Sequence, residues 1–299
     1  MATTAVDLLP TPSPTPPPQS AAPPELPVAI NTATRKQHTE LNRLIIDRIP
    51  LALPPTTRTP KVYALGLAAF AQIYLAFEHA FDTLERSQDA ADSTDKDAVH
   101  QREIKAWLST LRPTSLKRSP RLKRDLQYLP ELDRSAFAAL DEEIASHILS
   151  LTAAKPHTLV AYTWVMYMAI FSGGRWIRSQ LASPEPEFWT AHTNAGPALA
   201  EKTPPGMPGF SFLSFDGEQD GEDIKAEYKK RLAEGENLLS AQEREDITAA
   251  SQELFERCIQ IVKKLDVEVA KQHIRSRILP VVLMAVVFLF ALAYYRFRR

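Results

Sequence analysis

The stretch PHTLVAYTWVMYMAIFSGGRWIRSQL, residues 156–181, decides how this chain folds. It is apolar around most of its circumference, which is typical of a helix buried on all sides. Ser172-Gly173-Gly174 interrupts it, and each glycine weakens a helix by about 1 kcal/mol relative to alanine. Either the helix ends here, or something flat and bulky comes closer to the backbone than a side chain permits.

Helical periodicity continues through most of the chain on both sides of this stretch. Residues 61–86 are apolar nearly all round and resemble a membrane span, but Gln72, Glu78 and His79 interrupt them, so a central buried helix is the better interpretation. Further helices are predicted over residues 33–49, 133–151 and 221–238 and over a last amphipathic segment that contains Cys258. No strand alternation of useful length occurs. The pattern predicts one all-α domain of about 240 residues.

Composition limits the class of protein. The 299 residues are 44% hydrophobic and 24% charged, which suits a globular core. The net charge of −1 provides no global field that would attract nucleic acid. The single cysteine, Cys258, excludes an intramolecular disulfide and a zinc cluster, which fits a reducing compartment.

The two ends of the chain differ in character. Nine of the 24 prolines lie in the first 27 residues, so residues 1–28 are predicted to be a disordered tail. At the other end, Ile278–Tyr295 is 18 residues long, has no charge and is flanked by arginines. As a helix it would span about 27 Å, close to the thickness of a bilayer core. The predicted division is a tail (1–28), a helical domain (29–274) and a C-terminal transmembrane anchor (275–299), with the domain facing the cytosol.

The sequence lacks a phosphate-binding glycine loop, a Gly-x-Ser-x-Gly motif and a His-Glu-x-x-His motif. What remains is a set of residues suited to haem. His38 on an early helix is a possible axial ligand, because neutral imidazole binds haem iron well. The glycines of 172–174 allow a helix backbone to lie against a porphyrin face. Lys225, Lys229 and their neighbours Lys230 and Arg231 could pair with the haem carboxylates.

The order of these features resembles the haem oxygenase family over most of residues 30–272. The stretches that carry the resemblance are ATRKQHTELN, FAQIYLAFEHAF, LVAYTWVMYMAIFSGG, GFSFLSF and IKAEYKKRL, followed by a membrane tail. It implies a haem oxygenase-like helical fold, with His38 as the proximal iron ligand and Ala169–Gly174 as the distal helix over the haem. It also implies catalytic roles for Ser172, Gly173, Gly174 and Tyr167, and haem-binding roles for Lys225, Lys229, Ala169 and Ile170.

The chain also departs from the family pattern. Ile170 replaces the carboxylate that organises distal water in the family, and Ala169 replaces the first distal glycine. Trp164 stands where the family has a tyrosine, and Asn31 where it has a lysine. Asn42 replaces the carboxylate that holds the other ring nitrogen of the proximal histidine, and so lacks the charge that raises ligand basicity.

Three functions are therefore open. The first is a haem oxygenase, which uses O2 and electrons from an NADPH-cytochrome P450 reductase-type donor to convert haem to biliverdin, CO and ferrous iron. The second is a non-catalytic haem-binding sensor, buffer or carrier at a membrane, which Ile170 favours. The third is a helical scaffold that has lost haem.

Two further expectations concern the surroundings of the protein. The basic run at Arg112, Lys117, Arg118, Arg121, Lys123 and Arg124 could dock an acidic reductase, or it could be a solvated loop. The family resemblance favours the endoplasmic reticulum membrane. The basic residues after the anchor favour the mitochondrial outer membrane as the alternative.

Overall fold

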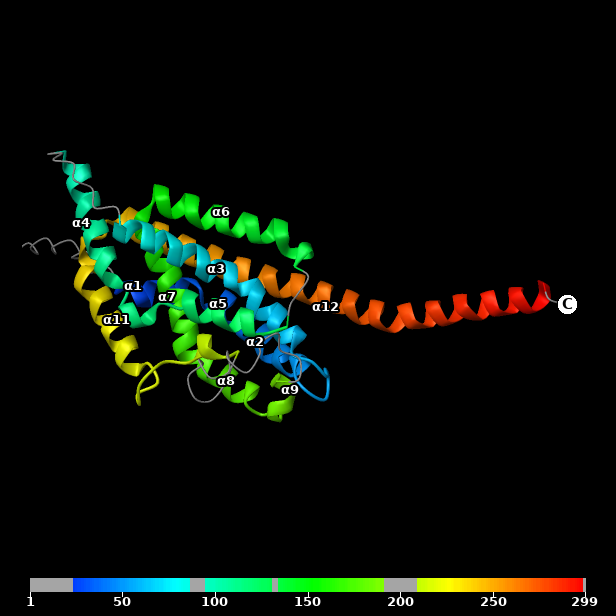
Figure 1. The fold of residues 1–299 in the computed structure, drawn as a ribbon. Helices are drawn as coiled ribbons and strands as arrows, with labels where there is room; N and C mark the ends of the chain where they lie inside the picture. The colour runs from blue at the N-terminus through cyan, green and yellow to red at the C-terminus, as the bar shows by residue number, and fades with distance from the viewer. Residues whose placement is uncertain (1–23, 87–94, 131–133, 191–208, 298–299) are drawn as a thin grey trace, which may run out of the picture.

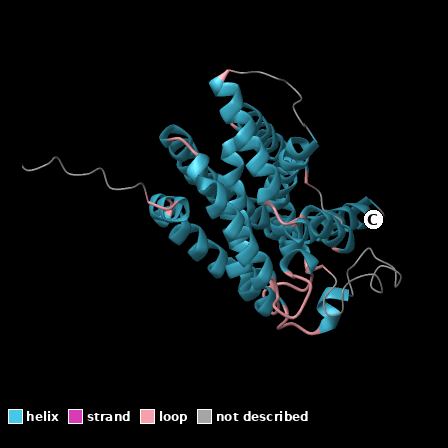
Figure 2. Ribbon diagram, turned by 90° about the vertical axis from the view of Figure 1, so that its left-hand side faces the viewer, coloured by secondary structure: helices cyan, strands magenta, loops and turns pink. Residues whose placement is uncertain are grey.

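The computed structural model describes residues 24–86, 95–130, 134–190 and 209–297, and beyond residue 271 it describes only one side chain, that of Met284. All the regular elements within these residues are helical, as the sequence predicted. Figure 1 shows helices packed around one another, with the last helix extending far beyond the rest. Figure 2 shows the helices in a view turned by 90°.

The N-terminal half contains α1 (Leu26–Ala33), α2 (Arg35–Arg48), α3 (Lys61–Arg86), α4 (Lys96–Leu111), α5 (Ser119–Tyr128) and α6 (Ala138–Ala154). The C-terminal half contains α7 (Leu159–Ala169), α8 (Arg175–Leu181), α9 (Pro186–Thr190), α11 (Glu222–Gly235) and α12 (Ala241–Phe297). Short 3-10 helices join several of these elements, among them Ile49–Ala52, Pro156–Thr158 and Ser211–Leu213.

Helices α3, α7 and α12 form the centre of the fold. Helix α3 packs against α6, α7 and α12, and α12 also packs against α1 and α2. By length and composition, helix α3 could cross a membrane, because its most apolar 18-residue segment has a mean hydropathy of 1.3. However, 61% of that segment is buried inside the protein. The prediction of a central buried helix at residues 61–86 is therefore confirmed.

The buried carboxylate of Glu78 explains the charge inside this apolar helix. Its two oxygens accept hydrogen bonds from the backbone N–H groups of Arg118 (2.7 Å) and Ser119 (2.8 Å), at the start of α5. It also accepts the hydroxyl of Tyr167 on α7 at 2.9 Å. Three donors offset the cost of burying the charge. Glu78 thus joins α3, α5 and α7 at one point.

The two ends of the chain depart from the predicted boundaries. Helix α1 begins at Leu26, inside the predicted tail, and Leu26 and Ile30 are buried in the core. Residues 1–23 lie outside the described part of the chain. At the C-terminus, α12 runs unbroken from Ala241 to Phe297, so the predicted boundary at residue 275 falls within a continuous helix. The membrane anchor remains a prediction.

Candidate functional site

The glycine break forms a π-helix. Helix α7 passes into a π-helical turn, Ile170–Gly174, and continues as α8. The helix therefore does not end at the glycines. The turn has a buried side, which includes Ile170 and Gly174, and an open side. We call the open side the glycine face; it consists of Ala169 and Ser172, which are exposed, and of Gly173, which is half-buried.

The two glycines have different causes. A Cβ on Gly174 would lie 3.3 Å from Cγ2 of Ile170 and 3.6 Å from a methyl of Leu213, so close packing explains that glycine. A Cβ on Gly173 would meet nothing within 4 Å. Packing does not require a glycine at position 173. Gly173 leaves bare backbone facing open space, which suits the close approach of a flat ligand.

A clamp holds the break from its buried side. Phe171 stacks on Phe215 with ring centroids 4.7 Å apart. Beyond the break, the guanidinium of Arg178 donates to both carboxylate oxygens of Asp220, and Arg175 donates to the Asp220 carbonyl at 2.7 Å. The hydrogen bond from Arg178 holds the pKa of Asp220 below its usual range. The start of α8 is thereby fixed to the loop before α11.

Tyr74 on α3 is a residue that the sequence did not single out. Its hydroxyl donates to the carbonyl of Met166 at 2.9 Å. That carbonyl also accepts the N–H of Ile170, at the point where the π-helix begins. Tyr74 therefore supports the last α-helical turn before the break. Its position among buried apolar residues gave no signal in the sequence.

His38 lies on the exposed side of α2, close to α12. The edge of its ring meets the ring of Phe255, with centroids 5.8 Å apart and planes at 86°. Within the described residues no hydrogen bond occupies either nitrogen of the ring. Nearby, Leu44 of α2 packs with Ile259 and Val262 of α12, which fixes the helix that carries the histidine. An imidazole that is held by packing but has free nitrogens is available to a ligand.

Helices α2 and α7 both pack against α12. The Gln252 amide reaches the Ala33 carbonyl at 3.0 Å, and Arg48 further along α2 pairs with Asp266. On the other side, His157 pairs with Asp246 just before α7.

A direct bond sets the register of α7 against α1. Trp164 Nε1 donates to Asn31 Oδ1 at 3.1 Å. His38 follows Asn31 by seven residues, across the end of α1 at Ala33, and Ala169–Gly173 follow Trp164 by five to nine residues. The bond therefore ties the helix before the one that carries His38 to the helix that leads into the glycine face.

The structure also places the predicted basic residues of α11 beside this region. Tyr228 is buried, donates its hydroxyl to Thr163 Oγ1 at 2.9 Å, and stacks near Trp164 with centroids 6.4 Å apart. Lys229, the next residue, is exposed and has no partner among the described residues. Lys225 is half-buried and pairs with Glu222 at 3.3 Å. A haem carboxylate would have to compete with Glu222 for Lys225, whereas Lys229 is free.

Two predicted site residues lie away from the glycine face. Tyr167 is fully buried, and its hydroxyl is committed to Glu78; burial raises its pKa well above the usual value. Ile170 is only 3% exposed and packs toward Gly174 and Leu213. Neither side chain reaches the open face in this structure. Their proposed roles at a ligand stay predictions.

The predicted reductase-docking patch is wrong for two of its six members, Arg112 and Arg118, which are buried. Arg118 is 1% exposed and donates to three backbone carbonyls, and Arg112 is also buried. Arg112 and Lys117 both pair with Asp82, and Arg121 pairs with Asp216. Arg112 and Arg118 are internal braces because their long stems pack inward, whereas Lys117 and Arg121 are partly exposed and already paired. The segment is also not a loop, since it forms a 3-10 helix and α5.

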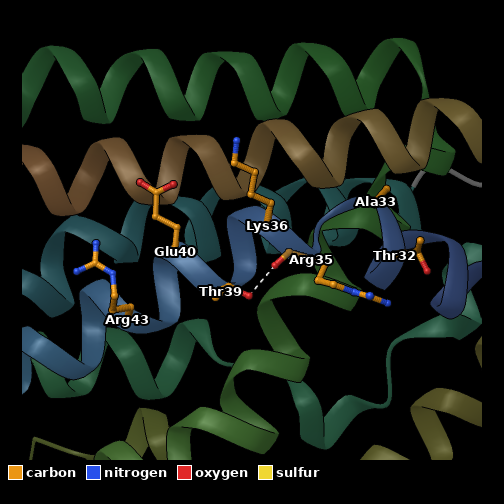
Figure 3. Close-up of a pocket in the computed structure, with 7 residues that line it drawn as sticks. All are labelled: Thr32, Ala33, Arg35, Lys36, Thr39, Glu40 and Arg43. Atoms are coloured by element: carbon orange, nitrogen blue, oxygen red, sulfur yellow. Dashed lines mark hydrogen bonds between the residues drawn. The ribbon is translucent and has the colours of Figure 1, made fainter.

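The described part of the chain contains an open cavity of about 560 Å³ on the outer side of α2. It is lined by Thr32, Ala33, Arg35, Lys36, Thr39, Glu40 and Arg43, as Figure 3 shows. His38 and the glycine face are not part of its lining. The cavity is therefore distinct from the region between His38 and α7.

The sequence and fold of this chain match those of known proteins. The Heme oxygenase family model matches residues 25–264. The chain belongs to the haem oxygenase family. The match begins at α1 and ends within α12, so it includes every predicted site residue.

This haem oxygenase family member also resembles a yeast protein over most of its length. The Heme-binding protein HMX1 of Saccharomyces cerevisiae is 25% identical over 237 residues, which cover 74% of this chain and 69% of the yeast protein.

Solved haem oxygenases share the fold. The Leptospira interrogans enzyme has a TM-score of 0.54 at 19% identity and covers 80% of this chain and 98% of that one. Heme oxygenase-2 of Synechocystis sp. PCC 6803, solved with heme and NO, has a TM-score of 0.58 at 17% identity and covers 83% and 88% of the two chains.

Proposed function

We propose that the protein is a haem oxygenase that opens the haem ring to biliverdin and releases CO and ferrous iron. Two observations carry the proposal: no hydrogen bond from the described residues occupies the ring nitrogens of His38, and the bare backbone of Gly173 faces open space. Bound haem would be both the substrate and the source of the iron that activates O2. The electrons would come from an NADPH-dependent reductase of the cytochrome P450 reductase type.

The residues of this chain fit such a ligand. His38 would hold the iron from the α2 side, and Phe255 would keep the ring of His38 in place. The glycine face would admit the flat macrocycle close to the helix backbone. Lys229 would pair with a haem carboxylate at the rim without losing an existing partner. Ser172, exposed on the same face, is the hydroxyl best placed to order water there.

A haem-binding protein that does not open the ring is the second candidate. Ile170 supports it, because the residue that replaces the family carboxylate is apolar and buried and can neither donate nor accept a proton. The yeast relative, which is named a heme-binding protein, supports it as well.

One turnover experiment separates these two functions. Haemin is added to the purified full-length chain, which is then reduced under O2 by an NADPH-dependent reductase. A haem oxygenase loses its Soret band as biliverdin absorption rises. A persistent Soret band under the same conditions selects the non-catalytic protein. Absence of any Soret shift on adding haemin would select the scaffold that has lost haem.

We also propose that Ile278–Tyr295 anchors the protein in a membrane with the domain facing the cytosol. The endoplasmic reticulum is the preferred location and the mitochondrial outer membrane the alternative. The unbroken helix α12 supports the anchor, because a spanning segment must satisfy its backbone hydrogen bonds internally. Deleting the residues after Arg275 should release the chain from membranes. Recovery of the truncated chain with membranes after an alkaline wash would contradict the anchor.

A further inference from the structure

The segment that joins α2 to α3, residues 49–61, presents a firmly held apolar tip. We call it the end loop. Leu51 is 48% exposed, whereas its neighbours Ala52 and Leu53 are buried in the core and hold the loop in place. Further along, the hydroxyl of Thr57 accepts the N–H of Thr59 and donates to its carbonyl, which orders the turn. An exposed leucine on an ordered loop contributes nothing to the core.

The end loop is also positively charged. It contains Arg58 and Lys61, both exposed, and the sequence has no acidic residue between Asp47 and Glu78. Neither cation has a carboxylate partner among the described residues, and Asp47 is already paired with Arg43 at 3.2 Å. The loop therefore carries two uncompensated positive charges beside an apolar tip.

The end loop lies at the end of the domain where α12 leaves it. Arg48, the last residue of α2, donates two hydrogen bonds, of 2.7 and 2.6 Å, to the carboxylate of Asp266 on α12. Figure 1 shows α12 extending onward from this end, past the blue loop that follows α2. The lysines of α12 in the same region, Lys263, Lys264 and Lys271, are already paired with Glu40 and Glu268, so the uncompensated charge belongs to the end loop.

The length of α12 sets the distance between this end and a bilayer. From Asp266 to Ile278 is 12 residues, or about 18 Å of helix. The headgroup layer occupies roughly 5–8 Å of that length. The headgroup surface would then lie about 10–13 Å beyond Arg48. Figure 1 shows the loop after α2 reaching toward that side of the domain. Electrostatic attraction extends about 8 Å at physiological salt.

We propose that the end loop docks on the anionic surface of the bilayer that α12 enters, with Arg58 and Lys61 on lipid phosphates and Leu51 at the headgroup boundary. The proposal rests on the proposed anchor. A continuous helix with a second contact beside it would hold the domain in one orientation on the membrane. Each cation near an anionic surface favours the docked state by roughly fivefold.

A fluorescent probe on the full-length chain tests the contact. Leu51→Cys is labelled with an environment-sensitive dye and reconstituted into vesicles of phosphatidylcholine with or without phosphatidylserine. The native Cys258 is buried and burial raises its thiol pKa to about 12, so the label goes to position 51. Val28→Cys is the matched control, because Val28 is 51% exposed and lies on α1. Quenching by spin-labelled lipid headgroups is then measured for both.

We expect strong quenching at position 51 in phosphatidylserine vesicles, and little quenching there in phosphatidylcholine alone or at position 28. Arg58→Glu with Lys61→Glu should lower the docked-to-undocked ratio by roughly 25-fold or more. Quenching at position 51 should then be the same in vesicles with and without phosphatidylserine. Equal quenching at positions 51 and 28 would overturn the proposal. So would quenching that follows the density of protein rather than the phosphatidylserine content, because it would indicate contact between copies of the chain.

The same vesicles separate failure of the docking from failure of the anchor. A chain that stays in the vesicles after an alkaline wash but shows no quenching at position 51 refutes the docking and leaves the anchor intact. A chain that is washed off refutes both. The haem turnover experiment is independent of either result.

Discussion

The indole nitrogen of Trp164 donates a hydrogen bond to the side-chain oxygen of Asn31 across 3.1 Å. The bond joins α7, which leads into the glycine face, to α1, which precedes the helix that carries His38. Both residues occupy positions where this chain departs from the pattern that its resemblance to haem oxygenases implies. That pattern has a tyrosine at position 164 and a lysine at position 31. The two departures are therefore one feature, because each residue supplies the partner of the other.

Removing this bond should weaken the domain slightly. Trp164→Phe keeps an aromatic ring beside Tyr228 but removes the N–H donor, so the free energy of unfolding should fall by about 1 kcal/mol. That corresponds to a fall in melting temperature of roughly 2–4 °C. Trp176→Phe is the control, since Trp176 is 39% exposed on α8. Thermal unfolding measures both, and equal effects would mean that the Asn31 bond contributes nothing.

His38→Ala should remove the proximal nitrogen. The ferric haem spectrum should change, and added imidazole should partly restore it by filling the space that the side chain leaves. His79→Ala, on the exposed side of α3, should leave the spectrum as it is. If the two variants behave in the opposite way, the ligand is His79. Absorption spectra of the haem-loaded proteins decide between them.

Ile170→Asp tests whether the distal position accepts a carboxylate. Because Ile170 is buried against Gly174 and Leu213, the variant loses apolar packing and buries an unpartnered charge. The free energy of unfolding should fall by about 3 kcal/mol, or roughly 6–12 °C in melting temperature. Ser172→Asp, on the exposed side of the same turn, should change it by about 0.5 kcal/mol at most.

The haem chemistry of these variants is a second measurement. If a distal carboxylate is needed and an aspartate at position 170 turns from the buried side toward the glycine face, Ile170→Asp and Ala169→Gly/Ile170→Asp should form more biliverdin per electron consumed than the natural chain, despite their lower stability. The double variant should gain more, since it also removes a methyl group from the glycine face. A natural chain that is already as efficient as the variants would show that the carboxylate is dispensable.

Two glycines predict stability changes of opposite sign. A Cβ on Gly235 would lie 2.1 Å from the indole of Trp107, whose Nε1 donates to the Arg231 carbonyl. Gly235→Ala should therefore cost about 3 kcal/mol through overpacking. A Cβ on Gly66, inside α3, meets nothing within 4 Å, so Gly66→Ala should add about 0.5–1 kcal/mol through helix propensity. Denaturant unfolding measures both, and a destabilised Gly66→Ala would contradict the second half.

The Asp220 clamp predicts a dependence on acid pH. The hydrogen bond from Arg178 lowers the pKa of Asp220 in the folded protein. Its contribution is therefore fully present above the unfolded pKa of about 4 and is lost as the pH falls through the lower folded value. Asp220→Asn removes the charge, and asparagine tolerates the backbone φ of +47° there. The melting temperature of the variant should fall less than that of the natural chain between pH 5 and pH 2, because the variant has no carboxylate to protonate at this position.

The sequence was informative where helical periodicity and special residues coincide. The buried runs at 61–86 and 156–181 contain the central helices, and the glycines mark a true irregularity of the backbone. The basic run at 112–124 was misleading at Arg112 and Arg118, because the presence of cations in a sequence does not show which of them turn inward. Arg118 is buried by contacts with the carbonyls of Leu116, Ser115 and Ser214, and the last of these is far away in the chain.

The sequence by itself determined the helical class, the central helices, the position of the glycine break and the resemblance to haem oxygenases, because these depend on local period and on residues only a few positions apart. Only the tertiary structure decided which side of the break is open, that a Cβ at 174 would press on Ile170 whereas one at 173 would meet nothing, and that Ile170 and Tyr167 face inward. The physical reason is that a side chain's direction depends on neighbours brought together by folding. For the break, those neighbours are Leu213 behind Gly174 and Glu78 beside Tyr167.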